Sequence, residues 1–499
     1  MLVIRDHQPR LFLGILFAIV AASLYLRFQF NFNAGHMDEY DYLFVGKQLL
    51  SGESWPSHTY IFGSDFNWYV LGWGEQMFGG LAGARMIAAC FGLLSLLGMY
   101  WLVYSLWQRH LTAIIATCLL ALQPLQLFIS RFATYDIISF ALFTLALAPL
   151  YLACQQPERF QRRNLILSII LMSLAVMSKY VVILYMPLIA GLAFLGNRKA
   201  GFIFGAAVGS ILLAYMAYHW DALKTVYEIQ IVGVHGAGNS TPDFILGAVR
   251  TYLSFLSIAW MVAMFWVISQ HKKGFWRERI VRQLGFLLIL ALPMAIYHFN
   301  ALNMIALYKH LVYACFFLVP ALAWLLTKLV DSADLSWMRQ GLAAGIVILL
   351  CHGGYQQLKT IEVAYADVTP VINQTQKALT SEDTILSEDP YLFRYLGQSL
   401  IQQSQIKETG WLDNNLDGKH EHQDVIDAVW DKKFSYVFQN DQLHFELNKK
   451  LRGILKQRGY KSLIDIPYQL SDVMSRQTKG SLSLYQRVQA VPEWAEGID

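Results

Sequence analysis

Long apolar segments separated by short polar turns dominate the first 355 residues of the chain. A helix needs about 20 apolar residues to cross a hydrocarbon core of about 30 Å. Segments of this kind recur along the chain, and together they predict about eleven transmembrane helices. The predicted spans are 11–30, 81–106, 111–129, 137–154, 164–178, 180–195, 201–219, 251–269, 284–299, 311–329 and 338–355.

The apolar run 165–195 can be read as one helix or as two, because only Ser178 and Lys179 interrupt it. At 1.5 Å per residue it is too long for one upright helix and short for two. With two spans, all the basic loops lie on the cytoplasmic side, as the positive-inside rule requires. With one span, the strongest basic block, 272–282, lies outside. We therefore predict a turn at Lys179 and a cytoplasmic N-terminus.

The composition agrees with a polytopic membrane protein, since 56% of the 499 residues are hydrophobic and only 15% are charged. The net charge of +4 comes mostly from short basic loops, and no basic patch with interleaved aromatic residues is present. Membrane lipids are therefore expected partners, and nucleic acid is not. The five cysteines show no metal-ligand spacing.

The chain turns polar after residue 355, so we predict a transmembrane domain at 1–355 and a soluble α/β domain at 356–499. Short strands are expected at Thr384–Ser387, Phe434–Phe438 and Ser481–Arg487, and a helix at 441–458. The predicted topology places this domain on the outer face of the membrane.

The loop 31–80 is also predicted to lie outside, and it begins with the acidic residues Asp38, Glu39 and Asp41. Acidic residues suit a helix N-terminus, and Ser51 and Gly52 suit its end. We therefore expect an amphipathic helix from about residue 38 to 50 along the membrane surface.

Charged residues from separate parts of the chain are predicted to gather on this outer side. Such groups persist at a membrane border when they converge on a shared polar cavity. Cations at headgroup depth suit a phosphate leaving group, whose oxygens gain charge as the bond to it breaks. An ionised aspartate nearby can accept the proton of an incoming hydroxyl. The pattern predicts group transfer from a lipid-phosphate donor.

Five motifs resemble those of the GT-C glycosyltransferases, of the protein O-mannosyltransferase and aminoarabinose transferase type. The resemblance covers about residues 10–355, with the motifs in order. The chain departs from the family pattern at two places. Tyr180 stands where the family usually has glycine, and residues 66–69 stand where its first loop usually has Pro-Pro. The motifs are Asp38-Glu39-Tyr40, Phe78 to Arg85, Ser130 to Asp136, Met177-Ser178-Lys179 and Tyr308 to Tyr313.

The resemblance implies a GT-C fold and a set of residue roles. Asp38 is the expected catalytic base, and Glu39 orients the loop or the acceptor. Asp136 is the third expected catalytic residue; it lies beside Asp38 and either positions the acceptor or tunes the pKa of that base. No cofactor or metal is expected; a divalent cation between the two aspartates is chemically possible but not favoured. The expected ligands of the donor phosphate are Lys179, Lys309, His310, Arg85 and Arg131.

Purely structural interpretations exist for the same residues. Asp38 and Glu39 could cap a surface helix, Arg131 and Asp136 could form an ion pair across a turn, and Lys179 could extend to the interface from a helix end.

The resemblance implies inverting transfer of a monosaccharide from a polyprenyl-phosphate sugar to a hydroxyl or phosphate of a lipid, glycan or protein acceptor. We expect this in a bacterial inner membrane, with the active site facing the periplasm or exterior. The alternatives are a transporter or flippase of a lipid-linked sugar and a non-catalytic assembly subunit.

Overall fold

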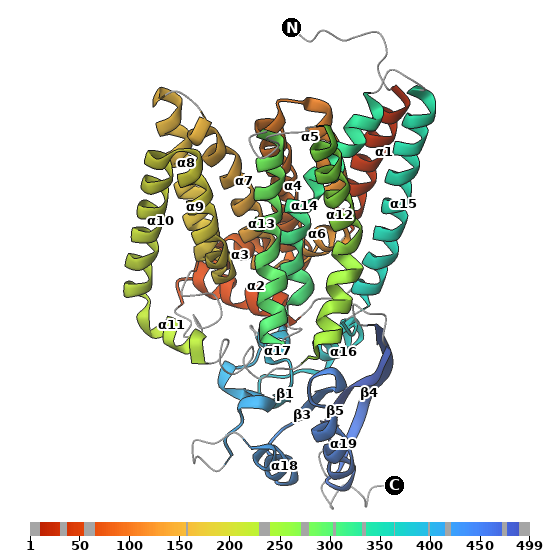
Figure 1. Cartoon of the computed structure of the whole chain (residues 1–499). Helices are drawn as coiled ribbons and strands as arrows, with labels where there is room; N and C mark the ends of the chain where they lie inside the picture. Colours follow the sequence, from red (N-terminus) through yellow and green to blue (C-terminus); the bar gives the residue numbers. More distant parts are fainter. Residues whose placement is uncertain are drawn as a thin grey trace, which may run out of the picture. The chain divides into compact units, whose positions relative to one another are not determined.

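The structure, a computed structural model (Figure 1), describes most of the chain, and it divides into two compact units. The first unit comprises 1–30 and 46–361, and the second comprises 31–45 and 362–499. Each unit is described by itself. The described residues are 10–29, 37–53, 65–155, 158–228, 240–270, 279–302, 306–331, 336–363, 365–397, 400–414, 421–471 and 477–488.

The first unit is a helical bundle, and each of the predicted spans coincides with helix in it. Six of the described helices are long and apolar enough to cross a membrane, namely α4, α7, α10, α12, α13 and α14. The number of spans and their orientation stay predictions. The helices of this unit are α1 (Arg10–Arg27), α3 (Phe66–Phe78), α4 (Gly80–Trp107), α5 (His110–Ala121), α6 (Pro124–Ile129), α7 (Tyr135–Gln155), α8 (Glu158–Ser178), α9 (Met186–Gly196), α10 (Arg198–Tyr218), α11 (Trp220–Val226), α12 (Pro242–Gln270), α13 (Arg279–Ala301), α14 (Leu307–Val330) and α15 (Ser336–Glu362).

The ambiguous run 165–195 forms two helical segments that meet at Lys179. Helix α8 ends at Ser178, and Lys179 has extended backbone angles of φ −153° and ψ 118°. The 3₁₀ helix η1 (Tyr180–Tyr185) follows and leads into α9. The predicted break at Lys179 is confirmed.

The predicted span 111–129 is divided into α5 and α6. Pro124 stands at the start of α6, and a proline lacks the N–H that a continuous helix would need there. The Gln123 side chain accepts a hydrogen bond from the backbone N–H of Gln126 and caps the new helix. The break therefore has a local cause that apolar length alone did not reveal.

Helix α14 lies at the centre of the bundle, since 94% of its most apolar stretch is buried. Its Tyr313 stacks on Tyr185 of η1 with the ring centroids 5.5 Å apart. Phe143 of α7 lies 5.3 Å from Tyr313, and Phe317 lies 5.9 Å from Phe143. We call these four side chains the aromatic layer, and it joins η1, α7 and α14. Figure 1 shows α14 in the middle of the bundle, among the other helices.

The predicted helix at 38–50 exists as α2 (Met37–Leu50). Its residues 39–46 are buried on every side of the helix rather than along one stripe. At Gly46 the backbone of α2 meets that of α3, because a Cβ atom added there would lie 2.5 Å from the Trp68 carbonyl oxygen. Its place relative to a membrane stays a prediction.

The second unit contains a five-stranded sheet in the order β2-β1-β3-β5-β4. Strands β2, β1 and β3 are parallel, and β5 pairs antiparallel with β3 and β4. All three predicted strands and the predicted helix are confirmed. The elements are β1 (Ile385–Ser387), β2 (Ile406–Glu408), β3 (Tyr436–Asn440), β4 (Tyr460–Ser471), β5 (Gln477–Arg487), α16 (Thr369–Ala378), α17 (Pro390–Leu396), α18 (His422–Trp430) and α19 (Asp441–Gln457).

Candidate active site

Three predicted site residues of the first unit form one buried ionic cluster. Asp136 accepts a hydrogen bond from the Nζ of Lys179 through its Oδ1 atom. The Oδ2 atom of Asp136 lies 3.2 Å from the Nζ of Lys309. The hydroxyl of Thr134 donates to the same Oδ2 at 3.0 Å. The side chains of Asp136 and Lys179 are 4% exposed and that of Lys309 is 13% exposed. We call Asp136, Lys179 and Lys309 the acid–lysine cluster.

The positions of these residues follow from breaks and ends in the helices. Asp136 lies in the first turn of α7, Lys179 in the break after α8, and Lys309 in the first turn of α14. Two hydrogen bonds fix the break. Ser139 of α7 donates to the carbonyl of Ala175, and the Asn67 amide donates to the carbonyl of Ser178.

The acid–lysine cluster is positively charged overall, because one carboxylate faces two ammonium groups. Burying such charges is costly unless they are paired, and Asp136 pairs with both lysines at this depth. The surplus positive charge favours an anion, and a phosphate fits it. The cluster can therefore hold an anionic group without giving up the Asp136 pairing.

His310, also predicted for the donor phosphate, is buried beside a second histidine. Its Nδ1 lies 2.8 Å from the Nε2 of His298 in α13, and the two residues are 2% and 0% exposed. One ring must donate and the other accept in this bond, so the protonation states of the two histidines are linked. His298 was not singled out in the sequence.

The predicted arginines lie in the same unit, around the turn that precedes α7. The guanidinium of Arg85 lies 5.6 Å from the ring centroid of Phe132, and Arg131 donates to the carbonyl of Gln29 at 3.1 Å. Arg27 of α1 is fully buried and donates a hydrogen bond to the carbonyl of Ala121 at 3.1 Å. Arg27 extends the group of cations, although its sequence position did not predict this.

The predicted acids of α2 belong to the second unit. Glu39 is fully buried, Asp41 is 9% exposed and Asp38 is partly exposed. Aromatic contacts hold this part of α2 against α17: the rings of Tyr40 and Tyr395 lie 5.6 Å apart. The helix thus packs within its unit beside residues from the distant tail.

Further carboxyl groups from the tail lie near Asp41. Burial, followed by repulsion from Asp38, raises the pKa of Asp41 well above its ordinary value, with Asp389 and Glu408 adding to the repulsion. Burial likewise raises the pKa of Asp389 to about 7. These groups favour the protonated form, which lessens the repulsion around Asp38.

The structure therefore brings together Asp136, Lys179 and Lys309, with His310, Arg85 and Arg131 in the same unit. The predicted position of Asp38 and Glu39 beside Asp136 stays a prediction. Among the described residues, no group of three or more His, Cys, Asp or Glu has the arrangement of a metal site.

A known family matches part of the chain. The family model of dolichyl-phosphate-mannose-protein mannosyltransferases matches residues 12–197. No curated protein matches the chain. The matched range includes four of the five motifs, so the resemblance inferred from them is confirmed, and with it the glycosyltransferase class of the relatives.

Solved structures share the fold at low identity. ArnT from Cupriavidus metallidurans, bound to undecaprenyl phosphate, superposes with a TM-score of 0.56 at 12% identity, covering 96% of this chain and 98% of that one. The oligosaccharyltransferase AglB from Archaeoglobus fulgidus, in complex with an inhibitory peptide and a dolichol-phosphate, superposes with a TM-score of 0.57 at 14% identity. The superposition covers 97% of this chain and 75% of that one. The chain therefore has the GT-C fold together with a small C-terminal sheet.

Proposed function

We propose that this chain is an integral membrane glycosyltransferase that transfers a monosaccharide from a polyprenyl-phosphate sugar to an acceptor hydroxyl or phosphate. The reaction inverts the anomeric centre and takes place on the extracytoplasmic face, in a bacterial inner membrane. The acceptor is a lipid, a glycan or a protein. The match to a mannosyltransferase family supports the reaction class.

The observation that carries the proposal is the acid–lysine cluster. A buried set of one carboxylate and two ammonium groups has the charge that a departing lipid phosphate requires. Two of the structural neighbours are described with undecaprenyl phosphate or dolichol-phosphate, which is the same chemistry.

The proposed reaction is a single displacement. The acceptor oxygen forms a bond to the anomeric carbon while the bond from that carbon to the phosphate oxygen breaks. The acceptor proton passes to the carboxylate of Asp38, and the electron pair of the broken bond stays on the phosphate. Lys179 and Lys309 neutralise the charge that grows there.

The other residues have supporting roles in this scheme. Asp136 is a positioning residue, since it holds the two lysine ammonium groups. His310, Arg85 and Arg131 add positive charge for the donor phosphate. Glu39 is proposed to orient the loop that carries it or the acceptor. No cofactor is proposed.

The identity of the donor can be tested by mass spectrometry of lipids that co-purify with the full-length protein. We expect a polyprenyl-phosphate sugar, and its head group names the sugar. A transfer assay with that lipid should yield free polyprenyl phosphate and a glycosylated acceptor. Translocation of the lipid across the bilayer without any transfer would instead support a flippase.

The base can be tested with Asp38→Asn, which removes the proton acceptor but keeps the side-chain shape. We expect loss of transfer by a factor on the order of 10² or more, with donor binding retained. Asp243→Asn is the matched control, because Asp243 is an exposed carboxylate in the first turn of another helix, α12. Near-normal turnover of the Asp38 variant would contradict the assignment.

A further inference from the structure

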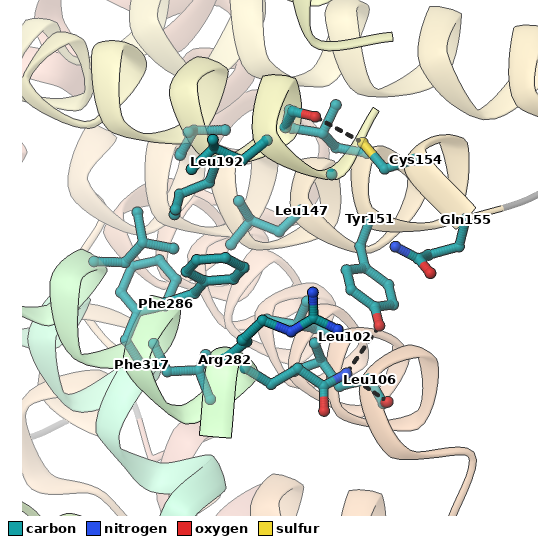
Figure 2. A pocket seen from close by; sticks show the side chains of 18 of the residues that line it. Leu102, Leu106, Leu147, Tyr151, Cys154, Gln155, Leu192, Arg282, Phe286 and Phe317 are labelled. Atoms are coloured by element: carbon teal, nitrogen blue, oxygen red, sulfur yellow. Dashed lines mark hydrogen bonds between the residues drawn. The ribbon is translucent and has the colours of Figure 1, made fainter. Parts of the chain in front are cut away.

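A cavity of about 370 Å³ lies between helices of the first unit, and it is separate from the acid–lysine cluster. Its walls come from α4, α7, α9, α13 and α14. Figure 2 shows apolar side chains such as Leu192, Phe286 and Phe317 toward one end, and Tyr151, Gln155 and Arg282 toward the other. The cavity is therefore amphipathic along its length.

The polar end is built by a hydrogen-bond network. Arg279 donates to the hydroxyl of Tyr151 at 2.8 Å and to the carbonyl of Leu106 at 3.3 Å. Gln283 donates to the same two groups at 2.9 Å each. All these acceptors are neutral, so the charge of Arg279 is not balanced by them.

Arg282 is a second cation at this end, and it is exposed. Within the ranges that the structure describes, no carboxylate pairs with Arg279 or Arg282. Two guanidinium groups beside an apolar cavity match an amphipathic ligand with an anionic head.

The cavity lies far from the acid–lysine cluster along the helices that they share. Asp136 is in the first turn of α7, whereas Tyr151 is 15 residues further on, which corresponds to about 22 Å at 1.5 Å per residue. The aromatic layer lies between them in α7 and α14, and Phe317 belongs to both the layer and the cavity wall. The cavity is not an extension of the candidate active site.

The cavity lies where the basic loops attach to the bundle. Its lining includes the last turns of α4, α7 and α9 and the first turn of α13. The sequence places Arg109, Arg198 and the basic block 272–282 beside those helix ends. The predicted topology makes this the cytoplasmic side, where anionic lipids and basic pockets between helices pair.

We propose that this cavity binds one anionic phospholipid, with an acyl chain between the leucine and phenylalanine side chains and the phosphate at Arg279 and Arg282. The volume is near the lower end of ligand pockets, about 300–1,000 Å³, and suits one acyl chain rather than a long polyprenyl chain. The site is independent of the proposed catalytic chemistry.

The proposal is tested by native mass spectrometry of the delipidated full-length protein with equal amounts of phosphatidylglycerol and phosphatidylcholine. We expect phosphatidylglycerol to be retained in preference. Arg282→Gln should weaken its binding on the order of tenfold, since one charged hydrogen bond is lost, and should leave phosphatidylcholine unaffected. Arg163→Gln is the matched control, an exposed arginine on α8 that does not line the cavity.

A second variant tests the apolar part of the cavity without changing any charge. Leu192→Phe places a larger side chain in the cavity wall and should reduce retention of phosphatidylglycerol, with the thermal unfolding midpoint unchanged. Equal retention of the two lipids, or unchanged binding by Arg282→Gln, would overturn the proposal. Undecaprenyl phosphate is included as a third lipid, and its selective, Arg282-dependent retention would overturn the choice of a phospholipid.

Discussion

Asp136 holds together residues that would repel one another without it. Its carboxylate contacts both Lys179 and Lys309, and all three side chains are mostly buried. The two lysines are therefore not equivalent to the carboxylate in a mutational test. Removing Asp136 breaks two buried ion pairs, whereas removing Lys309 breaks one and keeps the pair of Asp136 with Lys179.

Lys309→Met should keep the fold and weaken the binding of the lipid donor. Loss of one charged contact to phosphate corresponds to about 1.5–3 kcal/mol, so the KM for the lipid donor should rise on the order of 10–100-fold. Asp136→Asn should instead unfold more easily, by about 3–5 kcal/mol, because it removes the carboxylate that pairs with both buried lysines. The measurements are donor-dependent kinetics and thermal unfolding in detergent.

Lys328→Met is the control for this pair, since Lys328 is an exposed lysine near the other end of the same helix, α14. It should change neither quantity. An Asp136→Asn protein as stable as the wild type would show that the lysines do not depend on the carboxylate. Unchanged donor kinetics in Lys309→Met would remove that residue from the phosphate site.

The sequence predicted the residues of the acid–lysine cluster but not their pairing. A charge at the end of an apolar segment is conspicuous, and Asp136, Lys179 and Lys309 each occupy such a position. Which charges meet depends on helix packing, and no local pattern encodes it. Arg27 and His298 occupy comparable positions in the last turns of α1 and α13, and the same rule could have identified them.

At the scale of elements, breaks within helices place the functional residues. The charge balance of the loops predicted the break at Lys179, because a continuous helix would have moved a basic block across the membrane. The division between α5 and α6 depends on Pro124 and on the Gln123 cap, and hydropathy cannot detect it. Local chemistry decided where the helices stop, and apolar length decided only that they exist.

In the second unit, two parallel strands bring polar residues to one edge of the sheet. Glu388 follows β1, and its Oε2 accepts from the backbone N–H of Asn440, the last residue of β3. The amide of Asn448 in α19 donates to the same oxygen at 3.3 Å. Glu388 is 5% exposed, and burial raises its pKa to about 8.

This shift predicts that Glu388 makes the second unit more stable in mild acid than above about pH 8. The pKa of Glu388 in the folded state lies above the unfolded value of 4.5. Its contribution to the free energy of unfolding is therefore fully present below about pH 4.5 and is lost as the pH rises to about 8. The loss is on the order of a few kcal/mol. Hydrogen exchange of β1 and β3 in the full-length protein should therefore quicken between pH 5 and 8, after correction for the intrinsic rate.

Glu388→Gln should flatten this pH dependence, since the amide cannot ionise. Asp389 keeps part of the slope, because burial raises its pKa to about 7. Glu446→Gln, an exposed glutamate on α19, is the control and should leave the slope intact. An unaltered slope in Glu388→Gln would assign the pH dependence to other groups.

At the scale of the whole molecule, the chain divides in a way that hydropathy does not indicate. The sequence placed the domain boundary near residue 355, whereas the second unit begins at residue 362 and also includes residues 31–45. The extra segment joins through contacts such as Phe44 with Tyr391, whose ring centroids are 6.4 Å apart. Contacts between residues more than 300 positions apart have no signature in a single sequence.

The orientation of the chain in the membrane is the largest prediction still to be tested, and single cysteines can test it. In a variant without the five native cysteines, Lys199→Cys reports on the first turn of α10, at a basic end of the bundle, and Gln423→Cys reports on the second unit. Both positions are exposed. The positive-inside rule predicts that a membrane-impermeant maleimide labels Gln423→Cys in intact cells. Lys199→Cys should react only after permeabilisation.

The reverse pattern would affect more than the topology. It would place the basic loops and the amphipathic cavity on the outer side, away from the anionic lipids of the cytoplasmic leaflet. It would also place the first turns of α7 and α14, which carry Asp136 and Lys309, on the cytoplasmic side. The proposed transfer on the extracytoplasmic face would then be wrong, whereas the ionic contacts of the acid–lysine cluster would remain.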